Sequence, residues 1–159
     1  MPRNAASNSF EQHMLGNIEK HGWHCNWVET KDGGPSFAYT IGLFSSYGHP
    51  EIIVFGFGAD FAHELLSEVA AFAMARQPLD MNLPTDQLLK GFSCLFIEVP
   101  TSEKEGHALS ARWYYEDAPF PMYQLVWPST SGMFPWDSHA DASFHQSQPV
   151  LGDVPSPRS

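Results

Sequence analysis

The chain has 159 residues, of which 43% are hydrophobic and 14% aromatic, and this composition is typical of one globular domain. Eighteen acidic residues oppose eight Lys and Arg, and the formal net charge of −10 comes without any basic cluster that could bind nucleic-acid phosphates or an anionic membrane surface. The amino terminus has no apolar signal segment and no apolar run approaches about 18 residues, so we expect a cytoplasmic protein with neither a nucleic-acid nor a membrane partner.

A short surface helix is predicted after residues 1–8, a polar segment that we expect to be disordered. Phe10, Met14 and Ile18 recur at the spacing of one helical face. Gly22 follows, and glycine at this position typically ends a helix because it adopts a positive φ without strain. The helix is half polar, so it should lie on the surface of the domain.

Three strands are predicted next. Residues 23–29 alternate between two faces, as in a half-buried strand. Residues 31–35 have the glycine and proline content of a turn, and they lead into a strand at 37–43 whose one face carries only small side chains. A face of this kind indicates close packing against a helix. The apolar run at 52–55 is typical of a central strand buried on both faces.

The middle of the chain contains the strongest helical pattern. We expect this helix to be capped by Asp60 and to end before Pro78. Residues 77–90 predict an irregular connection, with room for a short helical turn at 85–89. Another apolar strand is expected at 92–99.

The last third of the chain holds fewer clear signals. Residues 101–107 predict a charged loop, and residues 108–115 fit either a short helix, which we favour, or an aromatic strand. A final strand is expected at 122–127, and the polar remainder should wrap the surface before a disordered tail at 148–159.

These elements together predict an α+β fold. We expect a mostly antiparallel sheet of about five strands, with two main helices packed on one face. A single domain should span residues 9–147, between the two disordered ends.

Six short runs form the most distinctive pattern in the chain. They are HGWH at 21–24, FAYTIGL at 37–43, GHPEIIVFG at 48–56, ARWYY at 111–115, QLVWP at 124–128 and FPWD at 134–137. Their order and identity resemble a bacterial family of small proteins of unknown function, the DUF4262 family. The resemblance extends over about residues 18–152. It implies a compact domain with these runs as its functional surface, and it assigns no catalytic role.

His49 and Glu51 form one compact group of ionisable residues. Two residues apart on a strand, they point to the same side and could share a metal ion or act as an acid–base pair. His21 and His24 could approach them, so His24, His49 and Glu51 are weak candidates for a metal site, although their spacing matches no metal motif and we assign none. In the alternative interpretation His49 caps the turn and Glu51 is a solvated charge.

Aromatic residues indicate a second kind of site, a pocket for a flat or apolar ligand. Arg112 could bind a carboxylate or phosphate, or it could pair with Glu116 one helical turn away. The candidate ligand-binding residues are His21, His24, Tyr39, His49, Glu51, Arg112, Trp113, Gln124, Trp136 and Asp137.

Two functions remain open at this point. The first is a binding or accessory domain, which recognises a protein partner or a small ligand through an aromatic-lined surface or pocket. The second is a metal- or cofactor-assisted enzyme centred on His49, Glu51, His24 and Arg112, with a flavin-binding variant as one form. The sequence specifies neither a catalytic residue, a cofactor nor an oligomeric state.

Overall fold

The computed structural model describes residues 6–30 and 34–154. Most of the turn expected at 31–35 and both chain ends lie outside the described residues. Within the described ranges no helix has the length and apolar character needed to cross a membrane.

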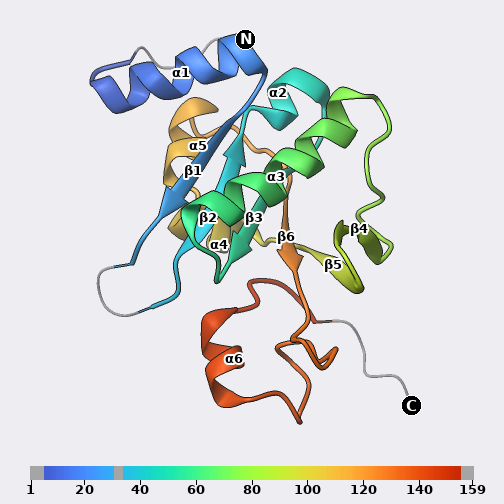
Figure 1. The fold of residues 1–159 in the computed structure, drawn as a ribbon. Helices are drawn as coiled ribbons and strands as arrows, with labels where there is room; N and C mark the ends of the chain where they lie inside the picture. Colours follow the sequence, from blue (N-terminus) through green and yellow to red (C-terminus); the bar gives the residue numbers. More distant parts are fainter. Residues whose placement is uncertain (1–5, 31–33, 155–159) are drawn as a thin grey trace.

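A mixed, mostly antiparallel sheet, with six strands in the described part of the chain, forms the centre of the molecule (Figure 1). Its order is β1-β2-β3-β6-β5-β4, and only the central pair, β3 and β6, is parallel. The strands are β1 (His24–Val28), β2 (Phe37–Ile41), β3 (Glu51–Phe55), β4 (Thr85–Leu89), β5 (Phe92–Glu98) and β6 (Met122–Val126).

Five of these strands confirm the sequence-based expectation, and β4 does not. The irregular connection and helical turn predicted there are wrong, because residues 85–89 pair with β5 as an antiparallel edge strand. Three of the five residues of β4 are polar and its register is interrupted, so it lacks the period-two alternation that identifies a strand.

Within the described residues, six helices accompany the sheet. They are α1 (Ser9–His21), α2 (Leu43–Tyr47), α3 (Ala59–Met74), α4 (Thr101–His107), α5 (Leu109–Tyr114) and α6 (Ala142–Ser147). The two main helices, α1 and α3, are confirmed, and so is the helical choice for α5. The charged loop expected at 101–107 is wrong, since this segment is α4. Gly58, rather than the expected Asp60, occupies the N-cap position of α3.

Helices cover both faces of the sheet, which corrects the expectation of one covered face (Figure 1). On one face α3 packs against β2 and β3, where Ala38 and Val54 contact the same cluster as Leu66. On the other face α1 and α5 cover Tyr39 and Ile53. Residues alternate between the two clusters along β2 and β3, and these strands, which are buried on both faces, have helices on each side.

The chain returns to the sheet after β6. Gln148 is fully buried, and its amide both donates to the carbonyl and accepts from the N–H of Trp127, at 2.8 Å each. A second pair of hydrogen bonds uses a side chain of β6. The Gln124 amide donates to Pro149 O at 2.7 Å and accepts from Leu151 N at 2.8 Å. Residues 148–151 are therefore held by β6.

Candidate functional site

A buried carboxylate organises the region around α2. Glu51 is the first residue of β3 and is fully buried. Its carboxylate accepts hydrogen bonds from the backbone N–H groups of Gly42, Leu43 and Phe44, at 3.0, 3.2 and 3.2 Å. These groups lie at the start of α2, where helical N–H groups have no partner within the helix. Glu51 thus caps α2 from the strand that follows it in the chain.

Two hydroxyl groups complete the surroundings of this carboxylate. Thr40 donates to it at 2.7 Å, and the Tyr115 hydroxyl donates to it as well. Burial raises the pKa of Glu51, and the hydrogen bonds from Tyr115 and Thr40 oppose that rise. The expectation of a solvated charge at Glu51 is wrong, because five donors of the protein occupy its oxygens.

The other end of α2 holds the end of α1. Ser46 Oγ donates to Gly22 O at 2.6 Å, and the Tyr47 hydroxyl donates to His21 O at 3.3 Å. Both acceptors are carbonyls at the carboxyl end of α1, which lack partners within that helix. Gly22 has a φ of 91°, and a Cβ at this position would overlap the Tyr47 hydroxyl, so glycine is required for the contact.

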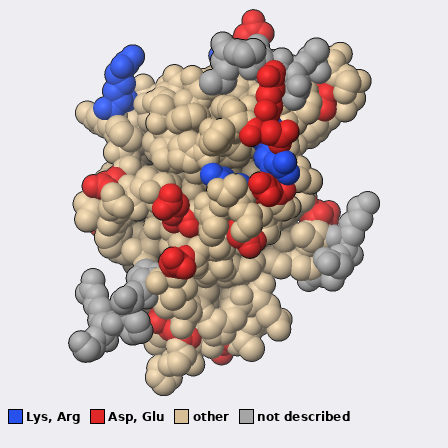
Figure 2. Space-filling model, turned by 180° about the vertical axis from the view of Figure 1, so that it is seen from behind, with Lys and Arg blue, Asp and Glu red and all other residues tan. Residues whose placement is uncertain are grey.

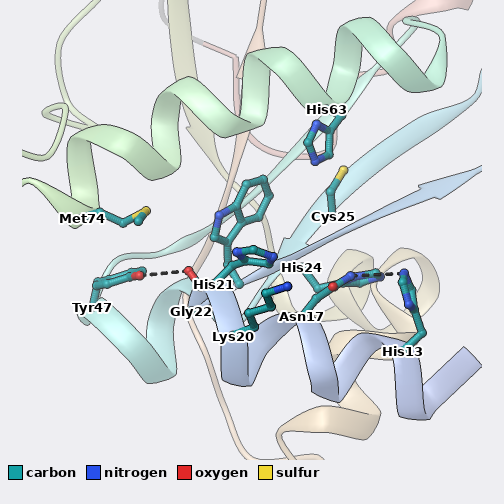
Figure 3. Close-up of a pocket in the computed structure, with 11 residues that line it drawn as sticks. His13, Asn17, Lys20, His21, Gly22, His24, Cys25, Tyr47, His63 and Met74 are labelled. Carbon is teal, nitrogen blue, oxygen red and sulfur yellow. Dashed lines mark hydrogen bonds between the residues drawn. The ribbon is translucent and has the colours of Figure 1, made fainter.

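A cleft of about 830 Å³, which we call the histidine cleft, lies along the free edge of β1 (Figure 3). Among the described residues β1 pairs with β2 alone, so its outer edge is open between α1 on one face and α3 on the other. His24 and Cys25 are adjacent in β1 and so point to opposite faces, yet both line the cleft. The cleft therefore curves around the sheet edge. Its lining includes His13, Lys20, His21, His24, Cys25 and His63.

One asparagine connects two of the histidines. Asn17 Nδ2 lies 2.9 Å from His24 Nδ1 and 3.3 Å from His13 Nε2 (Figure 3). An amide nitrogen can only donate, so Nδ1 of His24 is an acceptor and the neutral ring carries its proton on Nε2. The pKa of His24 is lowered to about 4, mainly by burial and also by the nearby His13 and His63. His24 is therefore a neutral N–H donor at pH 7.

The histidine cleft also has a flat wall and no acidic lining. Trp23 stacks with His63 at a ring-centroid distance of 5.8 Å and an interplanar angle of 21°. Four of the eight histidines of the chain and Lys20 line the cleft, and none of the described residues that line it is Asp or Glu. Elsewhere acidic side chains are spread over the surface, as Figure 2 shows for one face.

Cys25 does not supply a nucleophile to this cleft. Burial raises the pKa of its thiol to about 11, so the thiol stays protonated at neutral pH. The structure also has no group of three or more His, Cys, Asp or Glu placed to hold a metal ion, within the ranges that it describes.

A second, smaller cleft of about 390 Å³, which we call the His49 cleft, shares Tyr47 with the first. His49 is 5% exposed, and its Nδ1 lies 2.7 Å from Pro50 O. Its Nε2 is buried and has no hydrogen-bond partner among the described residues. Arg76 also lines this cleft, immediately after α3.

The candidate residues from the sequence do not converge on one site. His21 and His24 line the histidine cleft, His49 lines the second cleft, and Glu51 is enclosed under α2. Arg112 donates to Asp117 at 2.8 Å, instead of to Glu116. The four residues of the enzyme hypothesis thus occupy four different environments.

The remaining candidates have structural contacts. The Tyr39 hydroxyl is buried and accepts from Asn26 Nδ2 and Ser110 N, at 3.0 Å each. Trp136 stacks on Phe134, and Asp137 accepts from Phe134 N at 2.7 Å. Trp113 packs partly buried against the core cluster of α1 and α5, and Gln124 binds the carboxyl-terminal segment.

Sequence reasoning missed His13, Lys20, Tyr47 and His63. A signal for part of this set was present, because His13, Asn17 and His21 recur every four residues and so share one face of α1. His63 lies on a different helix, and only the tertiary fold brings it to Trp23.

The fold and the clefts define a mixed α/β domain with a ligand-sized opening at the edge of its sheet. The chain belongs to the family described as a domain of unknown function (DUF4262), whose family model matches residues 17–141. Comparison with curated proteins and with solved structures finds no match.

Proposed function

We propose that the protein is a binding module for a small acidic molecule with a flat ring, and that this molecule binds in the histidine cleft. The observation that carries the proposal is the lining of the cleft, where Lys20 and four histidines meet no carboxylate in a chain of net charge −10. A cleft that offers several side-chain donors and no carboxylate complements a carboxylate or phosphate.

Two further features support a ring-bearing ligand. The half-buried indole of Trp23 offers a flat apolar surface for stacking. The volume of about 830 Å³ lies within the range of about 300–1,000 Å³ that is typical of small-molecule pockets. His24 adds a neutral N–H donor, whose orientation is set by Asn17.

The proposal is tested by titrating the ¹⁵N-labelled protein with benzoate and with benzamide, which has the same ring but no charge. We expect benzoate to shift the amide resonances of residues 20–25 and to bind about 10-fold more tightly than benzamide, a difference of about 1.4 kcal/mol. The double variant Lys20→Gln, His21→Gln should remove this preference.

Lys90→Gln serves as the matched control. Lys90 is exposed and lies beside β4, at the opposite edge of the sheet from β1. This variant should bind benzoate as the wild type does. Equal affinity for the two probes, or a double variant that still prefers benzoate, would overturn the proposal.

A further inference from the structure

His49 holds a buried acceptor that the fold does not use. A carbonyl oxygen can only accept, so His49 Nδ1 carries the proton in its 2.7 Å contact with Pro50 O. The neutral ring then has a bare lone pair at Nε2, which is buried without a partner among the residues that the structure describes. Leaving a buried polar atom unpaired is unfavourable, and such atoms in folded proteins call for an explanation.

The cleft that His49 lines has both polar and apolar walls, and Tyr47 and Arg76 are among the polar ones. Its other walls include Pro50, Ala73, Leu79 and Met81, and its volume is about 390 Å³. This volume is near the lower end of the range of about 300–1,000 Å³ for small-molecule pockets, so the cleft suits a single ring or a short aliphatic group. A cleft with apolar walls beside an unpaired buried acceptor would select a ligand by its shape and by a hydrogen-bond donor.

We propose that the His49 cleft is a second small-molecule site, which binds an apolar group bearing one hydroxyl or amide N–H that donates to His49 Nε2. The ligand must supply the proton, because Nε2 is an acceptor in the tautomer set by Pro50. Burial lowers the pKa of His49, which keeps the lone pair available at neutral pH.

Arg76 restricts the donor further. Its side chain is exposed and lines the same cleft. A guanidinium is always charged, so it disfavours an ammonium donor nearby and tolerates a neutral or acidic ligand. The class of ligand is therefore an alcohol, a phenol or an amide with an apolar body, and not an amine.

Ligand binding in the two clefts can be tested separately, although Tyr47 lines both. The histidine cleft surrounds its ligand with several basic donors, whereas the His49 cleft offers the unpaired acceptor of His49 beside apolar walls. Loss of binding at one site therefore does not imply loss at the other.

Phenol and anisole provide the test, because they have nearly the same shape and only phenol can donate a hydrogen bond. In protein with ¹⁵N-labelled histidine, phenol should move the Nε2 resonance of His49 from the position of a bare imidazole nitrogen toward that of a hydrogen-bonded one. Phenol should bind at least about 10-fold more tightly than anisole, in line with one directed hydrogen bond.

Three variants separate the outcomes. His49→Leu should abolish the preference for phenol, and His49→Gln, which keeps a side-chain acceptor, should retain part of it even if the leucine variant folds poorly. His139→Gln, at an exposed position that lines neither cleft, should leave phenol binding unchanged. Equal binding of phenol and anisole, or a His49 Nε2 resonance that phenol does not move, would overturn the proposal.

Discussion

The surroundings of Glu51 and the histidine cleft lie at opposite ends of α2 and use their ionisable groups in opposite ways. The Glu51 carboxylate is fully buried and accepts from five donors of the protein. In the histidine cleft His13, Lys20 and His21 are exposed, and the cleft has no acidic lining among its described residues. A polar group whose hydrogen bonds are all made within the protein indicates a structural role. A polar group that is exposed in a cleft and can still form hydrogen bonds indicates a binding role.

Among these predictions, removal of the Glu51 carboxylate should have the largest effect on the stability of the protein. Glu51→Ala leaves three backbone N–H groups and two hydroxyl groups buried without their acceptor, so we expect the free energy of unfolding to fall by about 3–5 kcal/mol. Urea denaturation measures this loss. Glu51→Gln, which keeps one acceptor oxygen, should lose less.

Glu68→Ala is the matched control, since Glu68 is exposed on α3. It should change the unfolding free energy by less than about 0.5 kcal/mol. A Glu51→Ala protein as stable as the Glu68→Ala protein would show that the carboxylate does not hold α2.

The pH dependence of stability should show the next largest effect, and it depends on His24. Its pKa is about 4 in the folded state against 6.5 ordinarily, so between these pH values the unfolded chain binds a proton that the folded chain does not. Stability from this group is complete above pH 6.5 and decreases as the pH falls toward 4, by on the order of 2 kcal/mol.

Urea denaturation between pH 4 and 7 tests this difference. His24→Gln keeps an acceptor for Asn17 and should flatten the pH profile of stability. His139→Gln, at an exposed position after β6, should leave the profile as in the wild type. Identical profiles for the wild type and His24→Gln would contradict the low pKa.

The smallest effect concerns a single hydroxyl beside Glu51. Tyr115→Phe removes a donor to the carboxylate and an acceptor for Ser45 N, and should cost about 1–2 kcal/mol of unfolding free energy. Combined with Glu51→Gln in a double-mutant cycle, the two losses should not add, because both act on one hydrogen-bond network. Tyr123→Phe is the control. Additive losses in the cycle would show that Tyr115 does not belong to the hydrogen-bond network of Glu51.

The parts of the fold with strong periodicity were predictable from the sequence. The apolar run of β3 and the small face of β2 indicated a central strand and a covering helix, and α3 does pack there. In β4 the polar side chains hide the strand period, so only pairing with β5 reveals it. The covering of both faces depends on tertiary packing, which local patterns do not contain.

The candidate site was predictable only in part. The residue types alone identified His21, His24, His49 and Glu51 as candidates. They could not show that Glu51 is a buried helix cap whereas His21 and His24 line a cleft. That distinction depends on which donors the fold brings to each group. His63 lines the cleft only because α3 approaches the edge of β1. His63 there stacks with Trp23, which lies 40 positions earlier in the sequence.

The position of β6 has a consequence for synthesis of the protein. This strand lies between β3 and β5, although it follows both in the chain. As the chain leaves the ribosome, β1, β2 and β3 can pair with one another, and so can β4 and β5, but the inner edges of β3 and β5 have no neighbour until residues 122–126 emerge. Unpaired edges of this kind are sites of wrong pairing between chains. The sheet is therefore completed late in translation, by the strand that joins its two halves.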